Sequence, residues 1–411
     1  MQLATASETT TLSSLIDEAK KNNPEILAYQ KRVKAKEARA NIEGILDDPQ
    51  LKVEIEDIPG GRPFNLGDSM QTRYTFSQTL PFPGKLSLKQ KAAAKEVLMA
   101  ESEAKNKKLE IVTMLKEAYF DYAFLVESIK IAHEIKGIIS QMADIAGIRY
   151  ATNLASQQDV IKAQVELTVL NNELITLEAE KDVIAAKINS LLSRDTAAPL
   201  GEPEDIKAYR VKVTQGLSLE LQKIALEKSP TLKAMEYDIQ AREAEIELNK
   251  KSYYPDFMIG VAPIQRDGRF DTYDLMFSVN LPIWWGKYDN QVSEARANAE
   301  ILRTSLKAEQ NIKTFDVREA SVKVEAADRV RTVYETTLLP QADFSFQSAK
   351  ADYQTGKVDF LTMLESERAL RKTKIEYIKS VVEYRKDVAL LEKAVGEELE
   401  AMRLIPNNKI K

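Results

Sequence analysis

The chain has no cysteine and a single histidine, His133, among its 411 residues. Without cysteine it can form no disulfide, thiolate nucleophile or cysteine-borne lipid anchor. One histidine without thiolate partners also excludes most transition-metal sites. His133 has no carboxylate at ligand spacing, so we interpret it as a surface or seam residue. We therefore expect no metal site and no cofactor.

Long apolar runs are missing as well. No stretch approaches the roughly 18 apolar residues that a transmembrane helix requires. The first eleven residues are polar and lack an apolar signal region, so we interpret Met1 as a start added to a mature chain whose signal peptide is left out.

Charge of one sign does not accumulate, because 58 basic and 63 acidic residues are interspersed along the chain, with a net charge of -5. No basic patch is available for nucleic acid, which we do not expect as a partner. No phosphate-binding glycine loop and no plausible Ser/His/Asp set is present. The sequence thus gives no support for an enzyme.

Glycine and proline are scarce, with 14 of each, which favours long uninterrupted elements. Residues 88–149 contain no proline, so a helix there could reach roughly 90 Å at 1.5 Å per residue. Apolar residues repeat with a period near 3.5, which is typical of coiled coils. They are Ala118, Leu125, Ala132, Ile139 and Ala146, then Ala163, Leu167, Leu170, Leu174, Leu177, Ile184, Ile188 and Leu191.

The chain repeats its own plan. Asn23-Pro24 recurs as Ser229-Pro230, and matches in the same order continue over some 150 positions. We predict a first repeat at 12–193, a linker at 194–216, a second repeat at 217–397 and a C-terminal tail at 398–411. The predicted long helices cover about 88–149, 157–193, 289–352 and 358–396.

Two strands are predicted in each repeat, at about 50–58, 71–80, 256–264 and 272–281. In the last of these, Tyr273, Leu275 and Phe277 alternate with polar residues, so that one face is apolar and the other polar. Four strands alone would leave sheet edges exposed. Several protomers could close them into a barrel whose apolar face meets lipid. A water-soluble sandwich at the end of a coiled coil is the alternative.

Several motifs together resemble the TolC family of outer-membrane efflux proteins, over nearly the whole chain from Leu12 to Gly396. They are Asn23-Pro24-Glu25, the run Leu80-Pro81-Phe82-Pro83-Gly84-Lys85, Leu339-Pro340-Gln341-Ala342, the run from Tyr353 to Leu361, Leu364-Glu365 and Glu367-Arg368. The Pro-Gly-Lys strand end is more similar to the heavy-metal-efflux branch than to the drug branch.

This resemblance implies a mainly α protein with a β-barrel portion. In a homotrimer, a twelve-stranded outer-membrane barrel would continue into a twelve-helix periplasmic coiled-coil tunnel. The implied function is a passive outer-membrane conduit for small solutes, among them metal cations or drugs. Its implied partners are outer-membrane lipid, a periplasmic adaptor (membrane fusion) protein and an inner-membrane pump of the resistance-nodulation-division type. The alternative function is a soluble periplasmic structural or adaptor coiled coil.

The resemblance also maps a periplasmic gate onto two helix-turn-helix tips. The implied gate residues are Asp159, Tyr353, Lys357, Thr362 and Glu365. The family's locking arginine falls on Val358, which weakens the lock unless Lys357 substitutes for it. Asp159 and Glu365 could instead be merely solvated charges at helix tips.

Two surfaces complete the predicted sites. The tips expected to dock the adaptor comprise Asn153, Leu154, Ala155, Gly356, Lys357 and Val358. The expected membrane aromatic girdle comprises Tyr74, Phe76, Tyr273, Phe277, Trp284 and Trp285. For the two tryptophans, packing at the junction between strand and helix is the alternative.

Overall fold

A computed structural model describes residues 10–58, 61, 69–207, 211 and 213–399. Within these residues the chain divides into two compact units. Unit 1 comprises the described residues of 1–28, 105–230 and 310–411. Unit 2 comprises those of 29–104 and 231–309. Each unit draws on both sequence repeats, because the longest helices pass from one unit into the other.

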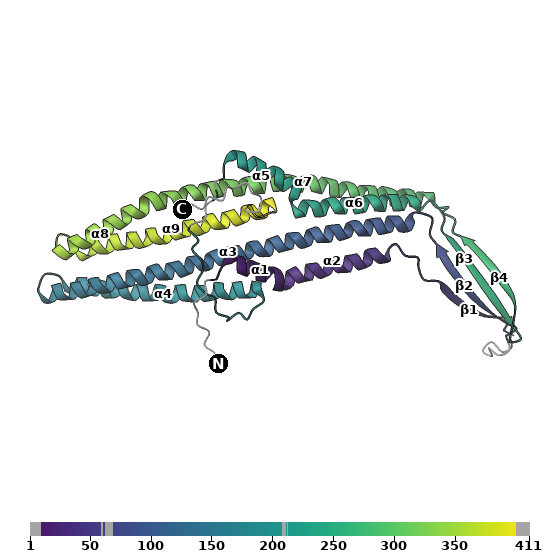
Figure 1. Cartoon of the computed structure of the whole chain (residues 1–411), viewed down its shortest axis with the longest axis horizontal. Helices are drawn as coiled ribbons and strands as arrows, with labels where there is room; N and C mark the ends of the chain where they lie inside the picture. Colours follow the sequence, from purple (N-terminus) through teal and green to yellow (C-terminus); the bar gives the residue numbers. More distant parts are fainter. Residues whose placement is uncertain (1–9, 59–60, 62–68, 208–210, 212, 400–411) are drawn as a thin grey trace. The chain divides into compact units, whose positions relative to one another are not determined.

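The first half of the chain contains four helices and two strands: α1 (Leu12–Asn22), α2 (Pro24–Ile42), β1 (Gln50–Glu56), β2 (Gln71–Leu80), α3 (Lys85–Ala151) and α4 (Gln157–Leu192). The second half repeats this order as α5 (Gln215–Lys228), α6 (Pro230–Lys251), β3 (Phe257–Arg266), β4 (Arg269–Val279), α7 (Trp285–Val333), α8 (Leu339–Thr355) and α9 (Phe360–Val395). Figure 1 shows these elements along the chain.

In unit 2, the four strands form one antiparallel sheet in the order β1-β2-β3-β4. The register places Leu51 opposite Phe76, Phe76 opposite Val261, and Val261 opposite Leu275, so one apolar row crosses the whole sheet. Leu275 is 78% exposed, and its neighbours on this face are also largely exposed. The predicted apolar face of the strands is therefore confirmed.

The opposite face of the sheet is polar along β1, β2 and most of β4, whereas β3 places Met258, Ala262 and Ile264 there. Arg73 Nε lies 3.0 Å from Glu56 Oε1, and its Nη1 lies 2.8 Å from Asp274 Oδ2. The hairpin between β3 and β4 turns at Asp267 and Gly268, both with positive φ, which gives the backbone twist that a two-residue hairpin needs. Both outer strands, β1 and β4, are hydrogen-bonded on one side only among the described residues.

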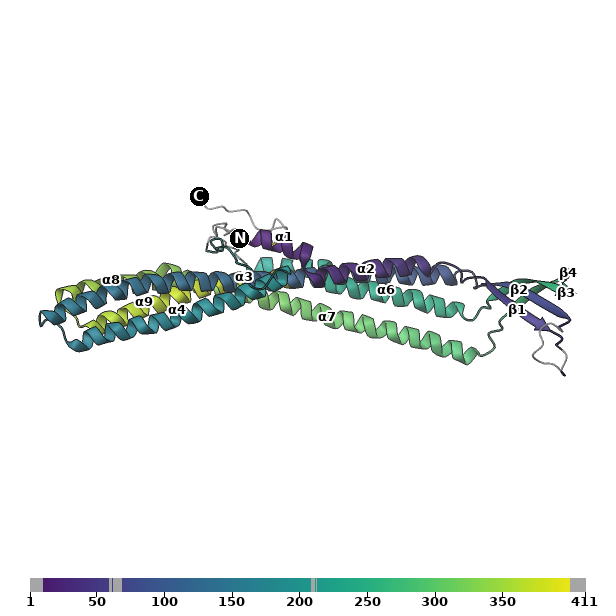
Figure 2. The ribbon, with the colours of Figure 1, turned by 90° about the horizontal axis from the view of Figure 1, so that it is seen from below.

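In unit 1, the helices α3, α4, α8 and α9 run alongside one another, as both ribbon views show (Figures 1 and 2). The predicted seam of α3 is buried at each of its five positions. The seam of α4 is buried at Ala163, Leu170, Leu174 and Ile188, and its other members are half-buried. Alanine at such positions lets helices approach closely, so a long interface forms without a thick core.

The long helix expected at 289–352 is interrupted by a π-helical turn at Tyr334–Leu338. Pro340 lies just beyond this turn. Because proline donates no backbone hydrogen bond and its ring crowds the preceding turn, the regular α-helical ladder cannot pass through it unchanged.

The described part of the segment 194–216, predicted as a linker, packs against unit 1. Ile206, Val211 and Val213 are buried in its cores, and the Tyr384 hydroxyl donates a 2.9 Å hydrogen bond to the Val211 carbonyl. The predicted tail lies outside the described residues beyond Leu399. No described helix has the length and apolar character needed to cross a membrane.

Close packing at the alanine seam predicts that Ala118→Leu destabilises the helical unit. Ala118 is fully buried, and inserting a larger side chain into such a site costs about 1–3 kcal/mol. Thermal unfolding followed by helical circular dichroism should show a lower midpoint for this variant. The matched control is Ala308→Leu, because Ala308 is exposed in α7. Equal midpoints for both variants would show that Ala118 is not closely packed between helices.

Candidate functional site: the ends of the helical hairpins

Two helical hairpins end near each other in unit 1. The turn from α3 to α4 uses Asn153 with φ 58°, and the turn from α8 to α9 uses Gly356 with φ 80°. Asp359 begins α9 by accepting a 2.8 Å hydrogen bond from the Thr362 amide. These local signals fix where each hairpin reverses direction.

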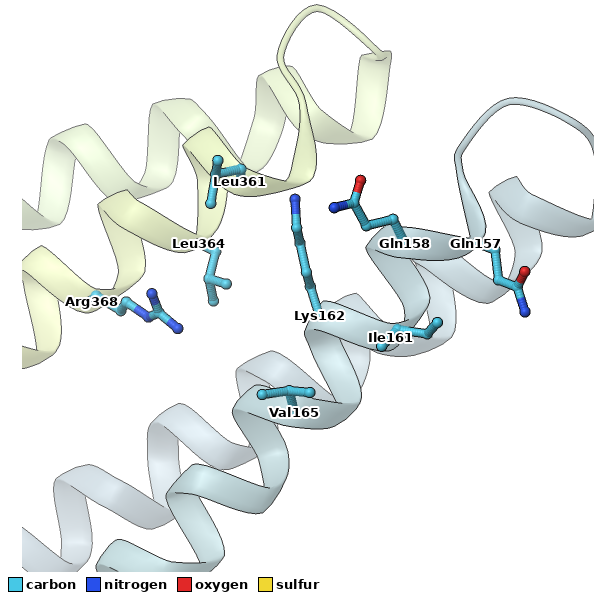
Figure 3. A pocket seen from close by; sticks show the side chains of 8 residues that line it. All are labelled: Gln157, Gln158, Ile161, Lys162, Val165, Leu361, Leu364 and Arg368. Carbon is cyan, nitrogen blue, oxygen red and sulfur yellow. The ribbon is translucent and has the colours of Figure 1, made fainter.

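An open groove of about 610 Å³ lies between α4 and α9 at these ends. Figure 3 shows Lys162 and Gln158 extending from α4 toward α9, with Leu361 and Leu364 on the facing helix. The groove is therefore lined by apolar side chains with cationic and amide groups among them.

Tyr353 anchors the end of α8. It is only 2% exposed, and its ring packs edge-on against Phe360 with 5.5 Å between ring centres. Burial raises the pKa of its hydroxyl above the usual value; the charge of Asp159 acts in the same direction and Arg149 opposes it. The hydroxyl is buried without a hydrogen-bond partner among the described groups.

Arg149, near the end of α3, joins the two hairpins. Its guanidinium lies 5.0 Å from the centre of the Tyr353 ring and donates to the Tyr353 carbonyl. It also donates a 3.3 Å hydrogen bond to the Leu154 carbonyl in its own turn. No local sequence pattern indicates a role for Arg149, because its partner Tyr353 is 204 positions away.

The predicted gate residues lie at these ends but are not all in contact. Asp159 is half-buried in the first turn of α4, close enough to act on the Tyr353 hydroxyl. Lys357 is exposed and lies 3.6 Å from Asp352, so it pairs within its own hairpin. Thr362 and Glu365 are exposed on α9.

The residues expected to dock an adaptor occupy the two turns. Leu154 is 69% exposed, and Asn153, Gly356 and Lys357 are also exposed. Ala155 and Val358 are half-buried, and Val358 packs against the core cluster that contains Phe360. The turns thus present a small, partly apolar surface.

The expected girdle residues lie on or next to the sheet in unit 2. Phe76, Tyr273 and Phe277 are exposed on its apolar face, whereas Tyr74 is half-buried and lies 5.8 Å from the ring of Phe270. Trp284 and Trp285 are exposed where the chain leaves the sheet, and Trp285 begins α7. Phe270, which is 64% exposed, was not among the predicted residues.

A partly buried ionic cluster lies beside the groove, between α4 and α9. It consists of Glu166, Glu173, Glu367, Arg368 and Arg371. The sequence signal for it was a carboxylate on the apolar stripe of α9, since Glu367 lies between buried Leu364 and Leu370. Among the described residues, no group of three or more His, Cys, Asp or Glu side chains could hold a metal ion.

Long helical hairpins, together with a sheet that exposes an apolar face, are features expected of a membrane channel protein. A profile of the outer membrane efflux protein family matches residues 15–194 and 221–397. The chain belongs to that family, which confirms the predicted resemblance and places the protein in the outer membrane.

Two curated relatives are named for metal resistance and for cation efflux. The chain is 23% identical to the cobalt-zinc-cadmium resistance protein CzcC of Cupriavidus metallidurans, over 90% of this chain and 85% of that one. It is 22% identical to the cation efflux system protein CusC of Escherichia coli, over 88% and 81% of the two chains.

Solved structures share the fold. A CusC structure superposes with a TM-score of 0.81 at 18% identity, covering 97% of this chain and 95% of that one. The outer membrane protein VceC of Vibrio cholerae gives a TM-score of 0.78 at 17% identity, with coverage of 94% and 96%.

Arg149→Met should loosen the end of the second hairpin. The methionine keeps an apolar stem but removes both hydrogen bonds and the charge over the Tyr353 ring, an interaction worth about 0.5–2 kcal/mol. Hydrogen exchange should accelerate in residues 350–358. Arg329→Met is the control, because Arg329 is 73% exposed on its helix; unchanged exchange in the Arg149 variant would show that this contact does not hold the tip.

Proposed function

We propose that the protein is a passive conduit that carries small solutes from a periplasmic pump to the outside of the cell. The observation that carries this proposal is the sheet of unit 2, with an exposed apolar face and, among the described residues, one unpaired edge on each outer strand. In water this surface would be costly and prone to aggregate.

If further copies of the chain close the sheet into a barrel, the unpaired strand edges find hydrogen-bond partners and the apolar face leaves water. Three protomers would bring about twelve strands together, within the range of outer-membrane barrels. β2, β3 and β4 contain 10, 10 and 11 residues, which matches the roughly 9–11 residues that a tilted strand needs to span a bilayer. The apolar face would then meet lipid, with the exposed aromatic residues as its girdle.

In this homotrimer the helical hairpins would line a periplasmic tunnel, and their ends would form its gate. Three copies of Glu365 and Asp159 would converge there and favour cations. The exposed turns with Leu154 and Lys357 would meet a periplasmic adaptor, and an inner-membrane pump of the resistance-nodulation-division type would supply energy and select the substrate.

Metal cations are the cargo that the curated relatives favour, since CzcC and CusC are named for cobalt-zinc-cadmium resistance and cation efflux. Here the ion is transported cargo. A soluble adaptor coiled coil would not require an exposed apolar sheet face, so the sheet disfavours that alternative.

Leu275→Arg tests the lipid-facing assignment. Leu275 lies in the middle of β4 on the apolar face, and an arginine at the bilayer midplane of a barrel costs about 2–4 kcal/mol. We expect this variant, expressed with a signal peptide, to be depleted from the outer-membrane fraction.

Ser278→Arg is the matched control, because Ser278 is on the same strand but on the polar face. It should assemble normally. Equal recovery of both variants from the membrane, or recovery of the unmodified protein in the soluble periplasmic fraction, would overturn the proposed barrel.

Glu365→Ala and Asp159→Ala test the gate in planar bilayers. Removing a ring of carboxylates should lower the cation preference and change the single-channel conductance. Glu178→Ala serves as the control, since Glu178 is exposed on α4 away from the turn. Conductance and selectivity that match the unmodified channel in both gate variants would reject these residues as gate residues.

A further inference from the structure

Glu367 is an unusual carboxylate in unit 1. Its side chain is fully buried in α9, and neither carboxylate oxygen has a hydrogen-bond donor among the described groups. An ionised carboxylate in such a place is strongly disfavoured, whereas the neutral acid is tolerated much better.

The cluster around Glu367 joins α4 to α9 through shared arginines. Arg371 faces three carboxylates at once: Nη1 lies 2.6 Å from Glu173, Nη2 lies 3.1 Å from Glu166, and Nε lies 3.6 Å from Glu367. Arg368 also binds the buried Glu166, with Nε 3.2 Å from its Oε2.

The protonation state of Glu367 decides whether the carboxylates and guanidinium groups of the cluster balance in number. With Glu367 neutral, Glu166 and Glu173 are matched by Arg368 and Arg371. With Glu367 ionised, three carboxylates, of which Glu166 and Glu367 are fully buried, compete for two guanidinium groups. Arg371 is then drawn away from Glu166 and Glu173, the carboxylates that bind α4 to α9.

The other helices packed here add mainly apolar surface. The surrounding core includes Ile139 and Met142 from α3 and Phe346 from α8. A charged pair between two helices lies about two turns farther along α9, where Lys374 Nζ is 2.8 Å from Glu134 Oε1 of α3. The charges that act on Glu367 come from Arg371, Glu166, Arg368 and Glu173.

We propose that Glu367 is a proton-binding group that fastens α4 to α9: protonated, it holds the two helices together, and loss of the proton releases them. Because these helices belong to different hairpins, deprotonation frees one hairpin end from the other. The consequence for conduction rests on the gate proposed above, since the same hairpins carry Asp159 and Glu365.

The direction of the pH dependence follows from the carboxyl group. Burial raises the pKa of Glu367 to about 7, with Glu166 adding to this effect and Arg371 opposing it. The raised value means that the contribution to stability is complete below the ordinary glutamate pKa of 4.5 and is lost as the pH rises through about 7. The α4–α9 contact is thus tight in acid and loose in base.

The absence of native cysteine allows a direct test. Spin labels at Gln164→Cys on α4 and Ala369→Cys on α9, both exposed positions, would report the distance between the helices in the detergent-solubilised full chain. Labelled chain is diluted with unlabelled chain, so that only distances within one chain are measured. We expect a short, narrow distribution at pH 5.5, a longer and broader one at pH 8.5, and a midpoint near 7.

Glu367→Gln mimics the protonated acid in size and charge, so it should keep the short distribution at both pH values. Glu166→Gln removes a charge that raises the Glu367 pKa and frees Arg371, so it should move the midpoint to lower pH. Asp387→Asn is the control. Asp387 is another carboxyl group of α9, and burial raises its pKa to about 6. This variant should leave the pH-dependent change in distance unchanged.

The proposal is overturned if the unmodified chain shows one distribution at both pH values, or if Glu367→Gln responds to pH as the unmodified chain does. The spin-label distances do not depend on whether the protein conducts ions. A protein that conducts nothing in a bilayer would therefore refute the proposed channel, while the labels would still decide the role of Glu367.

Discussion

The exposed apolar face of the four-stranded sheet is the constraint on which the rest of the protein depends. A row of apolar residues crosses all four strands, and within the described part of the chain the two outer strands keep unpaired edges. Backbone groups at such edges must find partners, and in a bilayer only a closed sheet provides them. The family to which the chain belongs supplies the setting, because its members are outer-membrane efflux proteins. A soluble fold would have covered this face with its own helices.

The long helices form an extended structure that needs only a narrow apolar seam and no thick core. The α3 seam alternates alanine with larger side chains such as Leu125 and Ile139, and all are buried. Small side chains bring helix axes close together and leave wide helical surfaces outside the seam. Ile175 and Val183 on α4 remain exposed in a single chain. An assembly of several copies would use such surfaces.

Charged groups connect the hairpins alongside the apolar core that they share. Arg149 reaches from α3 to Tyr353 on α8, and Arg371 bridges three carboxylates between α4 and α9. Buried ion pairs contribute less to stability than to the choice of one arrangement, because their desolvation offsets much of their attraction. The hairpin ends are therefore held in part by contacts that depend on charge.

The sequence by itself determined the helices, the two-faced strands and the family, because periodicity and turn residues act over short distances along the chain. It also indicated which strand face is apolar, although the pairing of β2 with β3 across the repeats came only from the structure. Pro340 was visible, yet its effect as a π-helical turn was not, since that depends on how the surrounding helix is held. Only the tertiary structure brought Arg149 to Tyr353 and placed Glu166 and Glu173 of α4 beside Glu367. These contacts join residues about 200 positions apart, and no local pattern encodes which side chains meet across so long a separation.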